Sequence, residues 1–132
     1  MPNSFLVVDD SKLVHRMYRL IFSRGNLAGS TVYHANDGRE GYSMLAAHPE
    51  LSLVLLDLNM PQINGLELLI RRQAERLHLH VPIVLVTTET TAGDELRGRA
   101  AGAWDYLRKP FQPSDVESLV ARVLAASPAA SA

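Results

Sequence analysis

The sequence predicts one α/β domain, in which five parallel strands in the order 2-1-3-4-5 form a doubly wound sheet flanked by five helices. Short apolar runs alternate with longer segments of helical period along all but the end of the chain. Most runs are apolar almost throughout, as in strands that are covered on both faces. Such alternation gives a parallel sheet with right-handed crossovers. The length of 132 residues suits a single domain with its own core.

The five strands are expected where the apolar runs lie. They are predicted at residues 4–8, 31–35, 51–57, 82–87 and 104–109. The second run is the most polar, which is typical of a strand at the edge of a sheet. The run 51–57 is apolar up to Asp57, which predicts a central strand with both faces buried.

The helices are predicted from capping residues and apolar spacing. Ser11 can cap the first helix, which ends before Gly25, and a turn at residues 36–38 leads into a second helix over 39–47. Asn64 can cap a third helix that runs to about residue 76. A short helix is expected over 94–101, and a last one from Pro113 to about Ala125. We expect residues 1–126 to form the domain and 127–132 to be a disordered tail.

Composition narrows the function classes. The formal net charge of -1 and the lack of a basic stripe argue against nucleic acid as a partner. The chain has no cysteine, which excludes disulfides and thiolate metal sites and fits a reducing cytoplasm. The N-terminus shows no signal peptide, and no run approaches the roughly 20 apolar residues of a membrane helix. We therefore expect a cytoplasmic domain that binds neither nucleic acid nor membrane.

Polar side chains end four of the predicted strands. Asp9 and Asp10 follow the first strand, Asp57 ends the third, Thr87 ends the fourth, and Lys109 closes the fifth. Ligands of an open parallel sheet bind at this edge, where the strand order reverses. Like charges about 4 Å apart repel by roughly 4 kcal/mol at an effective dielectric constant near 20. Lys109 balances one charge, and a hard divalent ion such as Mg²⁺ would balance the rest.

This set of groups predicts phosphoryl transfer onto a carboxylate. Aspartyl phosphates are established intermediates, and phosphoryl transfer needs mainly alignment and neutralised charge. Mg²⁺ and Lys109 would neutralise the phosphoryl oxygens, and the Thr87 hydroxyl would donate a hydrogen bond to one of them. The phosphorylated product carries more negative charge, so Thr87 and Lys109 could move toward it.

Over about residues 4–126 the chain resembles a response-regulator receiver domain of two-component signalling, a flavodoxin-like fold. The motifs that carry the resemblance are Asp9-Asp10-Ser11, Asp57 with Asn59-Met60-Pro61 and Gly65, Thr87, and Lys109-Pro110-Phe111 after Ala101-Gly102-Ala103. The resemblance implies that Asp57 is the phosphorylation site. It implies Mg²⁺, which Mn²⁺ could replace, bound by Asp10, Asp57 and the Asn59 carbonyl, with Asp9 acting through water.

The resemblance also implies partners and a switch. A histidine kinase or histidine phosphotransfer protein would supply the phosphoryl group, and small phosphodonors could do so too. Thr87 would shift and Tyr106 rotate inward, remodelling the face of the fourth helix, fifth strand and fifth helix for an effector protein. We expect Trp104, Tyr106 and Arg108 on one side of that strand, with Trp104 in the partner site. Pro110 is expected to follow a cis peptide bond.

The resemblance is greatest to single-domain chemotaxis-type receivers. In these proteins, residues corresponding to Asn59 and Glu89 tune loss of the phosphoryl group, which predicts rapid autodephosphorylation. We expect a stand-alone monomer or weak dimer that is not an enzyme beyond its own phosphorylation and dephosphorylation. A phosphorelay intermediate or phosphate sink is the alternative role.

Other functions fit less well. A haloacid-dehalogenase-like phosphatase needs a general acid two residues after its nucleophile, and the amide of Asn59 cannot donate that proton. In a flavodoxin-like cofactor domain, Asp9-Asp10 would repel the bound phosphate. If the chain were a purely structural interaction domain, the clustering of these polar groups at the strand ends would be a coincidence.

Several basic side chains are given ordinary surface positions. We expect His15 on a solvated helix face, and His78 and His80 in a solvated loop. Three arginines of the third predicted helix are expected on its exposed side. These are Arg71, Arg72 and Arg76.

Overall fold

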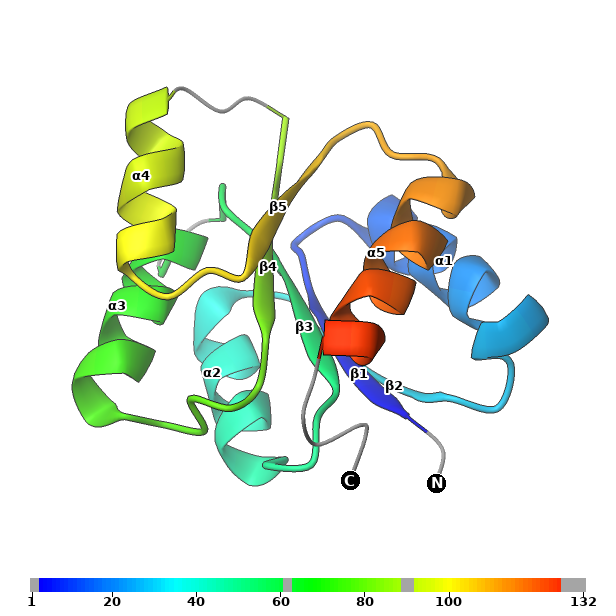
Figure 1. Ribbon diagram of the computed structural model, residues 1–132, viewed down its shortest axis with the longest axis horizontal. Coiled ribbons are helices and arrows are strands. Elements are labelled where there is room, and N and C mark those ends of the chain that lie inside the picture. Colours follow the sequence, from blue (N-terminus) through cyan, green and yellow to red (C-terminus); the bar gives the residue numbers. More distant parts are fainter. Residues whose placement is uncertain (1–2, 61–62, 89–91, 127–132) are drawn as a thin grey trace.

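The computed structural model describes residues 3–60, 63–88 and 92–126 (Figure 1). The strands form one parallel sheet in the order β2-β1-β3-β4-β5, as predicted. Their bounds are β1 Ser4–Val8, β2 Thr31–Ala35, β3 Leu53–Asp57, β4 Ile83–Thr87 and β5 Asp105–Arg108. The polar strand β2 lies at an edge, and β1, β3 and β4 are buried throughout.

Five α-helices connect the strands. Their bounds are α1 Lys12–Phe22, α2 Gly38–Ala47, α3 Gly65–Glu75, α4 Ala92–Ala100 and α5 Pro113–Ala126. Ser11 caps α1 by accepting a hydrogen bond from the Val14 N–H, and Asn64 caps α3 in the same way. A short 3₁₀ helix at Gly25–Leu27 follows α1. No helix of the described residues is long and apolar enough to cross a membrane.

The sheet separates two apolar clusters, because alternate residues of each central strand point to opposite faces. On one face, Val84 and Val86 pack with residues of α1 and α5 such as Phe22 and Leu119. On the other, Leu85 packs with residues of α2 and α3 such as Leu68. Figure 1 shows α1 and α5 on one side of the sheet and α2, α3 and α4 on the other. Because helices pack on both faces, the strands are held in place, and their carboxyl ends form one edge of the sheet.

Several strand and helix ends differ from the prediction by one or two residues. β3 begins at Leu53, because the Leu51 N–H bonds to the His48 carbonyl in a turn. β5 is shorter at both ends than the predicted strand 104–109. α4 begins at Ala92, before the predicted start at residue 94.

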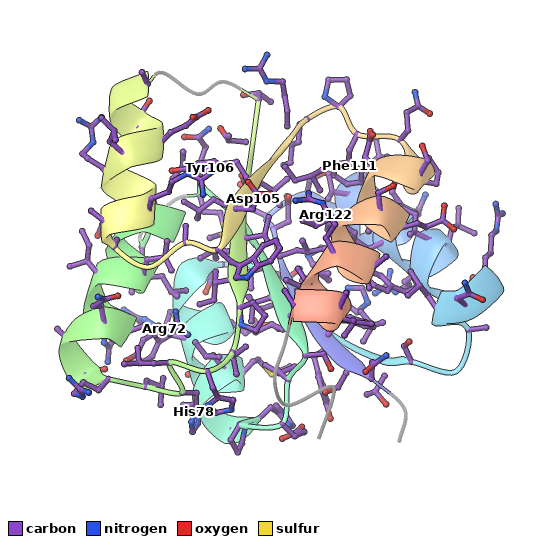
Figure 2. The ribbon with its side chains drawn as sticks, in the orientation of Figure 1. Arg72, His78, Asp105, Tyr106, Phe111 and Arg122 are labelled. Carbon is purple, nitrogen blue, oxygen red and sulfur yellow. The ribbon has the colours of Figure 1, made fainter. Side chains whose placement is uncertain are left out.

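The prediction that Arg72 is exposed is wrong. Its side chain is 2% exposed and points to the α3–β4 loop, where Nε donates to the Leu77 carbonyl at 3.1 Å (Figure 2). Nη2 donates to the carbonyls of His78 at 2.9 Å and Val81 at 2.6 Å. Arg72 lies on the buried stripe of α3, three and four residues after Leu69 and Leu68. A loop that offers carbonyl oxygens makes this buried charge tolerable. Arg71 and Arg76 are exposed, as predicted.

Candidate functional site: the acidic edge of the sheet

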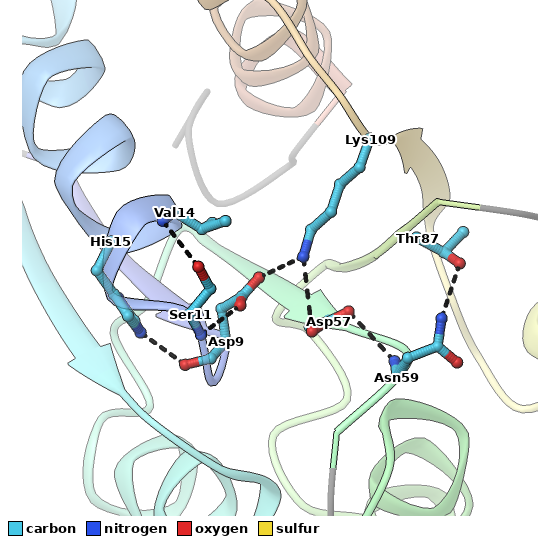
Figure 3. A network of polar contacts seen from close by, with 8 residues as sticks. All are labelled: Asp9, Ser11, Val14, His15, Asp57, Asn59, Thr87 and Lys109. Carbon is cyan, nitrogen blue, oxygen red and sulfur yellow. Dashed lines mark hydrogen bonds and ion pairs between the residues drawn. The ribbon is translucent and has the colours of Figure 1, made fainter.

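The carboxyl ends of the strands bring the predicted groups together (Figure 3). Asp9 follows β1 directly, Asp57 is the last residue of β3, and Thr87 is the last residue of β4. Lys109 follows β5 and reaches back across this edge. Asp9 and Asp57 are 1% and 4% exposed, so both carboxylates are held away from bulk water. The strand ends therefore converge on one buried polar site, as the sequence predicted.

Lys109 forms an ion pair with each buried carboxylate. Its Nζ lies 2.7 Å from Asp9 Oδ2 and 3.6 Å from Asp57 Oδ2. The closer contact to Asp9 leaves Asp57 less fully neutralised. Burial raises the pKa of Asp57, the negative charge of Asp9 raises it further, and Lys109 only partly offsets both. Asp57 is therefore a carboxylate in a site with excess negative charge.

The site has the donor chemistry of a hard-cation site. Asp9, Asp10 and Asp57 each offer an oxygen, and these atoms lie within 4.8 Å of one another. Asp10 is exposed, which leaves one side of the group open to solvent. Carboxylate oxygens with room for water are what Mg²⁺ takes in proteins. The three residues thus fit a divalent cation.

Backbone contacts fix the orientation of the two buried carboxylates. Asp9 Oδ1 accepts the Ser11 N–H at 2.9 Å, and Asp57 Oδ1 accepts the Asn59 N–H at 3.2 Å. The Asn59 side-chain amide lies 3.5 Å from the Thr87 hydroxyl oxygen. Gly65 lets α3 approach this edge, since a Cβ there would lie 2.7 Å from the Asp57 carbonyl oxygen. Ser11 is a contact to the site, whereas the sequence prediction treated it as a helix cap and as part of the Asp9-Asp10-Ser11 motif, with no contact to a carboxylate.

The prediction that His15 is solvated is wrong. Its side chain is 3% exposed, and Nε2 lies 2.7 Å from the Asp9 carbonyl oxygen. Its Nδ1 lies 2.7 Å from Nδ1 of His34 on β2. His15 falls on the buried stripe of α1 with Tyr18 and Phe22, which is the signal that could have found it. His78 and His80 bond to the carbonyls of residues 46 and 49 at the loop surface, which agrees with a solvated loop.

Comparison with known proteins assigns the family. A model of the response regulator receiver domain matches residues 5–121. The chain belongs to this receiver family. It is 34% identical to a CheY homolog of Campylobacter jejuni, a chemotaxis protein, over 90% of both chains. It is 33% identical to the chemotaxis protein CheY1 of Helicobacter pylori, over 90% of this chain and 94% of that one.

Solved structures agree with this assignment. The chemotaxis protein CheY4 of Vibrio cholerae superposes with a TM-score of 0.82 at 31% identity, over 93% of this chain and 99% of that one. The general role of receiver domains is to accept a phosphoryl group in two-component signalling. The family assignment decides against a haloacid-dehalogenase-like phosphatase and a flavodoxin-like cofactor domain.

The receiver's predicted switch residue, Tyr106, packs against α4. Its hydroxyl donates to the Asp94 carbonyl at 2.8 Å. Gly98 makes room for this contact, because a Cβ there would collide with the Tyr106 hydroxyl. Tyr106 therefore joins β5 to α4 next to the strand end that carries Thr87.

The prediction that Trp104 shares a side with Tyr106 is wrong. Trp104 precedes β5 and packs against the α1–α5 cluster, whereas Tyr106 packs against the opposite cluster. Strand alternation does not extend to Trp104, because it lies before the regular strand. The Trp104 ring instead lies beneath Arg122 of α5, whose guanidinium carbon is 5.8 Å from the ring centroid.

Asp105 connects the two helices on either side of β5. It forms ion pairs with Arg99 of α4 at 3.2 Å and with Arg122 of α5 at 3.0 Å. Burial acts to raise the pKa of Asp105, but the Tyr106 N–H and the two arginines outweigh it and lower the pKa. Figure 2 shows Asp105, Tyr106 and Arg122 together on this part of the molecule.

Glu89 and Pro61 lie outside the described residues, as does the expected tail 127–132. The peptide bond between Lys109 and Pro110 is cis, as predicted.

Proposed function

We propose that this receiver accepts a phosphoryl group on Asp57 from a histidine kinase or a histidine phosphotransfer protein, in a step that requires Mg²⁺. The observation that carries the proposal is the position of Asp57. It ends a buried strand with Lys109 Nζ 3.6 Å away and with two further carboxylates near enough to share a cation. Mn²⁺ could take the place of Mg²⁺, because both prefer oxygen ligands.

In the proposed reaction, a carboxylate oxygen of Asp57 forms a bond to phosphorus as the bond from phosphorus to the donor nitrogen breaks. The donor imidazole keeps the electron pair of that bond. Lys109 balances the charge of the phosphoryl oxygens, and the Thr87 hydroxyl donates a hydrogen bond to one of them. Asp10, Asp57 and the Asn59 carbonyl would hold Mg²⁺, with Asp9 acting through water. The ion would neutralise negative charge on the transferred group.

The phosphorylated chain would signal through the face formed by α4, β5 and α5. Thr87 moving toward the phosphoryl group would free space for Tyr106, whose hydroxyl now bonds to α4 at Asp94. The rearranged face would bind an effector protein, with Trp104 contributing to that contact. The names of the chemotaxis relatives favour a signalling role of this kind. The proposed location is the cytoplasm, with the chain acting as a monomer or weak dimer.

Loss of the phosphoryl group would be tuned by Asn59 and Glu89. Asn59 is exposed beside Thr87, where its amide could orient a water toward the phosphorus. We therefore propose a short-lived phosphorylated state. A lifetime of hours would contradict this part of the proposal.

The test is incubation of the chain with Mg²⁺ and acetyl phosphate, followed by intact-mass measurement. The wild type should gain one phosphoryl group, and Asp57→Asn should gain none. Asp105→Asn is the matched control, because it removes a carboxylate on the same sheet away from the acidic site, and it should be phosphorylated. Addition of EDTA should abolish the reaction. A wild-type chain that stays unmodified, or an Asp57→Asn chain that is modified equally, would contradict the proposal.

A further inference from the structure

A hollow of about 340 Å³ lies between α1 and the edge strand β2, beside the acidic site. All the side chains that line it can donate a hydrogen bond, and none is a carboxylate. They are Lys12, His15, Arg16, Arg19, His34 and Asn36. The hollow therefore gathers positive charge in a chain whose net charge is -1.

Three basic side chains of α1 line this hollow. Lys12, Arg16 and Arg19 follow one another at four- and three-residue steps, so they share one face of the helix. In the described part of the chain, none of them forms an ion pair within 4.0 Å. Elsewhere, Arg97, Arg99 and Arg122 are all paired with carboxylates. The guanidinium groups of Arg16 and Arg19 are thus available to an external anion.

The two histidines connect this hollow to the acidic site. The atom that faces Nε2 of His15 is a carbonyl oxygen, so this nitrogen must carry the hydrogen. In the neutral ring, Nδ1 of His15 is then an acceptor, and the hydrogen on Nδ1 of His34 bonds to it. Nε2 of His34 is left as the remaining polar atom of a ring that lines the hollow. The backbone of Asp9 is therefore two hydrogen bonds away from that atom.

The charge of the hollow suits a doubly charged anion. Burial lowers the pKa of His34 to about 4, and the positive charge that His15 would carry when protonated, together with that of Arg19, adds to this effect. A bound anion would offset those charges and favour a proton on Nε2 of His34, which would then become another donor. Guanidinium groups bind phosphate oxygens through paired hydrogen bonds. The donors that line this hollow lie close together, so they suit one small anion.

We infer that the α1–β2 hollow is a second anion site, which binds a phosphate dianion through Arg16, Arg19 and His34. The dianion can belong to free phosphate, to a small phosphate ester or to a lipid headgroup. This site is separate from the phosphorylation site and does not rest on the proposed function. Its link through His15 to Asp9 would let the occupied hollow affect the acidic edge.

The experiment is an NMR titration of the full chain in buffer that contains EDTA, so that Mg²⁺ does not bring phosphate to the acidic edge. The imidazole signals of His15 and His34 and the amide signals of Lys12 and Asn36 report on the hollow. Inorganic phosphate, glycerol phosphate and vesicles containing phosphatidic acid are added in separate arms, with sodium chloride at matched ionic strength as the blank. Vesicles of phosphatidylcholine alone control for membrane contact.

We expect saturable shifts of these signals with at least one phosphate source, and the arm that succeeds identifies the source. Arg16→Gln and Arg19→Gln should each weaken binding by about tenfold, since each removes a charge-assisted contact. Arg24→Gln is the matched control, because Arg24 is an exposed arginine just beyond α1 that lines a different hollow, and it should bind like the wild type. Shifts that sodium chloride reproduces, shifts confined to Lys109 and Asp57, or equal affinity in Arg16→Gln and Arg19→Gln would overturn the inference.

Discussion

The sheet carries buried charge at both of its ends, and the two ends treat that charge differently. At the amino end of β4, the Arg72 guanidinium is 2% exposed and donates to three backbone carbonyls. At the carboxyl end, Asp9 and Asp57 are equally buried, but they share the single ammonium group of Lys109. At the amino end, backbone carbonyl dipoles stabilise the charge of Arg72. At the carboxyl end, the negative charge of the carboxylates exceeds the positive charge of Lys109.

This difference indicates that the Arg72 end has a structural role and that the Asp57 end is a functional site. A buried charge whose hydrogen bonds are all made within the fold has no need of a ligand, and it holds the chain in one shape. A buried charge in excess costs stability until a ligand of opposite sign arrives. The Arg72 end should therefore govern stability, and the Asp57 end should govern chemistry. Four substitutions can break or sharpen this division.

Lys109→Gln should have the largest effect on the reaction. It removes the positive charge nearest the carboxylates, and the loss of one such group costs roughly 10²–10³ in rate. The rate of phosphorylation by acetyl phosphate, followed by intact mass, should fall by about that factor. Arg108→Gln is the matched control, because Arg108 is the adjacent cation and is exposed, and its rate should match the wild type. Equal rates for the two variants would remove Lys109 from the chemistry.

Arg72→Met should have the largest effect on stability. Methionine replaces much of the buried stem, but the carbonyls of Leu77, His78 and Val81 lose their donor. The free energy of unfolding in urea should drop by about 3 kcal/mol. The fraction that stays folded should be phosphorylated at the wild-type rate. Arg71→Met, at the exposed neighbouring position, is the control and should change stability much less. A slower phosphorylation of the folded Arg72→Met chain would show that the Arg72 end also affects the chemistry, and it would contradict the division.

Asp57→Asn should stabilise the chain without Mg²⁺, by about 1 kcal/mol at neutral pH. Because the pKa of Asp57 is raised in the folded chain, the folded state binds this proton more tightly than the unfolded state. Ionised Asp57 therefore destabilises the fold at neutral pH. This penalty fades as the pH falls through the raised pKa of the folded chain, and it is gone below the ordinary carboxyl pKa. Urea unfolding at pH 7 and at about pH 3 should show the gain only at pH 7. A loss of stability at pH 7 would contradict the excess of negative charge.

Asp105→Asn should have the smallest effect and the opposite sign. The folded chain holds the pKa of Asp105 below its usual value, so its ion pairs stabilise the fold above the unfolded pKa and lose that effect in acid. Its partners Arg99 and Arg122 are more than half exposed, so the loss at pH 7 should stay below about 1 kcal/mol. Urea unfolding at pH 7 and at about pH 3 measures this loss of stability. A gain in stability at pH 7 would mean that ionised Asp105 destabilises the fold, as ionised Asp57 does, and it would contradict the prediction.

Much of the carboxyl end could be predicted from sequence, because each functional side chain comes directly after an apolar run. The parallel order of the strands then brings Asp9, Asp57 and Lys109 together. The position of Arg72 at the amino end, and that of His15 beside the acidic edge, could not be predicted in this way. Arg72 and His15 lie on buried helix stripes, but their partners are backbone carbonyls of distant or irregular segments. Because arginine and histidine are polar, the sequence analysis predicted that both side chains are exposed to solvent. The carbonyl oxygens that bind them come into position only when the chain folds.

The measurement that tests the account most directly is an NMR comparison of the wild-type chain with and without Mg²⁺ and beryllofluoride, a phosphoryl mimic. The account predicts amide shifts at Asp57, Thr87 and Lys109, together with shifts at Asp105 and Tyr106 on the α4–β5–α5 face. The α3–β4 loop around Arg72 should stay unchanged. Shifts that stop at the acidic edge, or that spread equally to the Arg72 end, would contradict the division between a reactive end and a scaffold end.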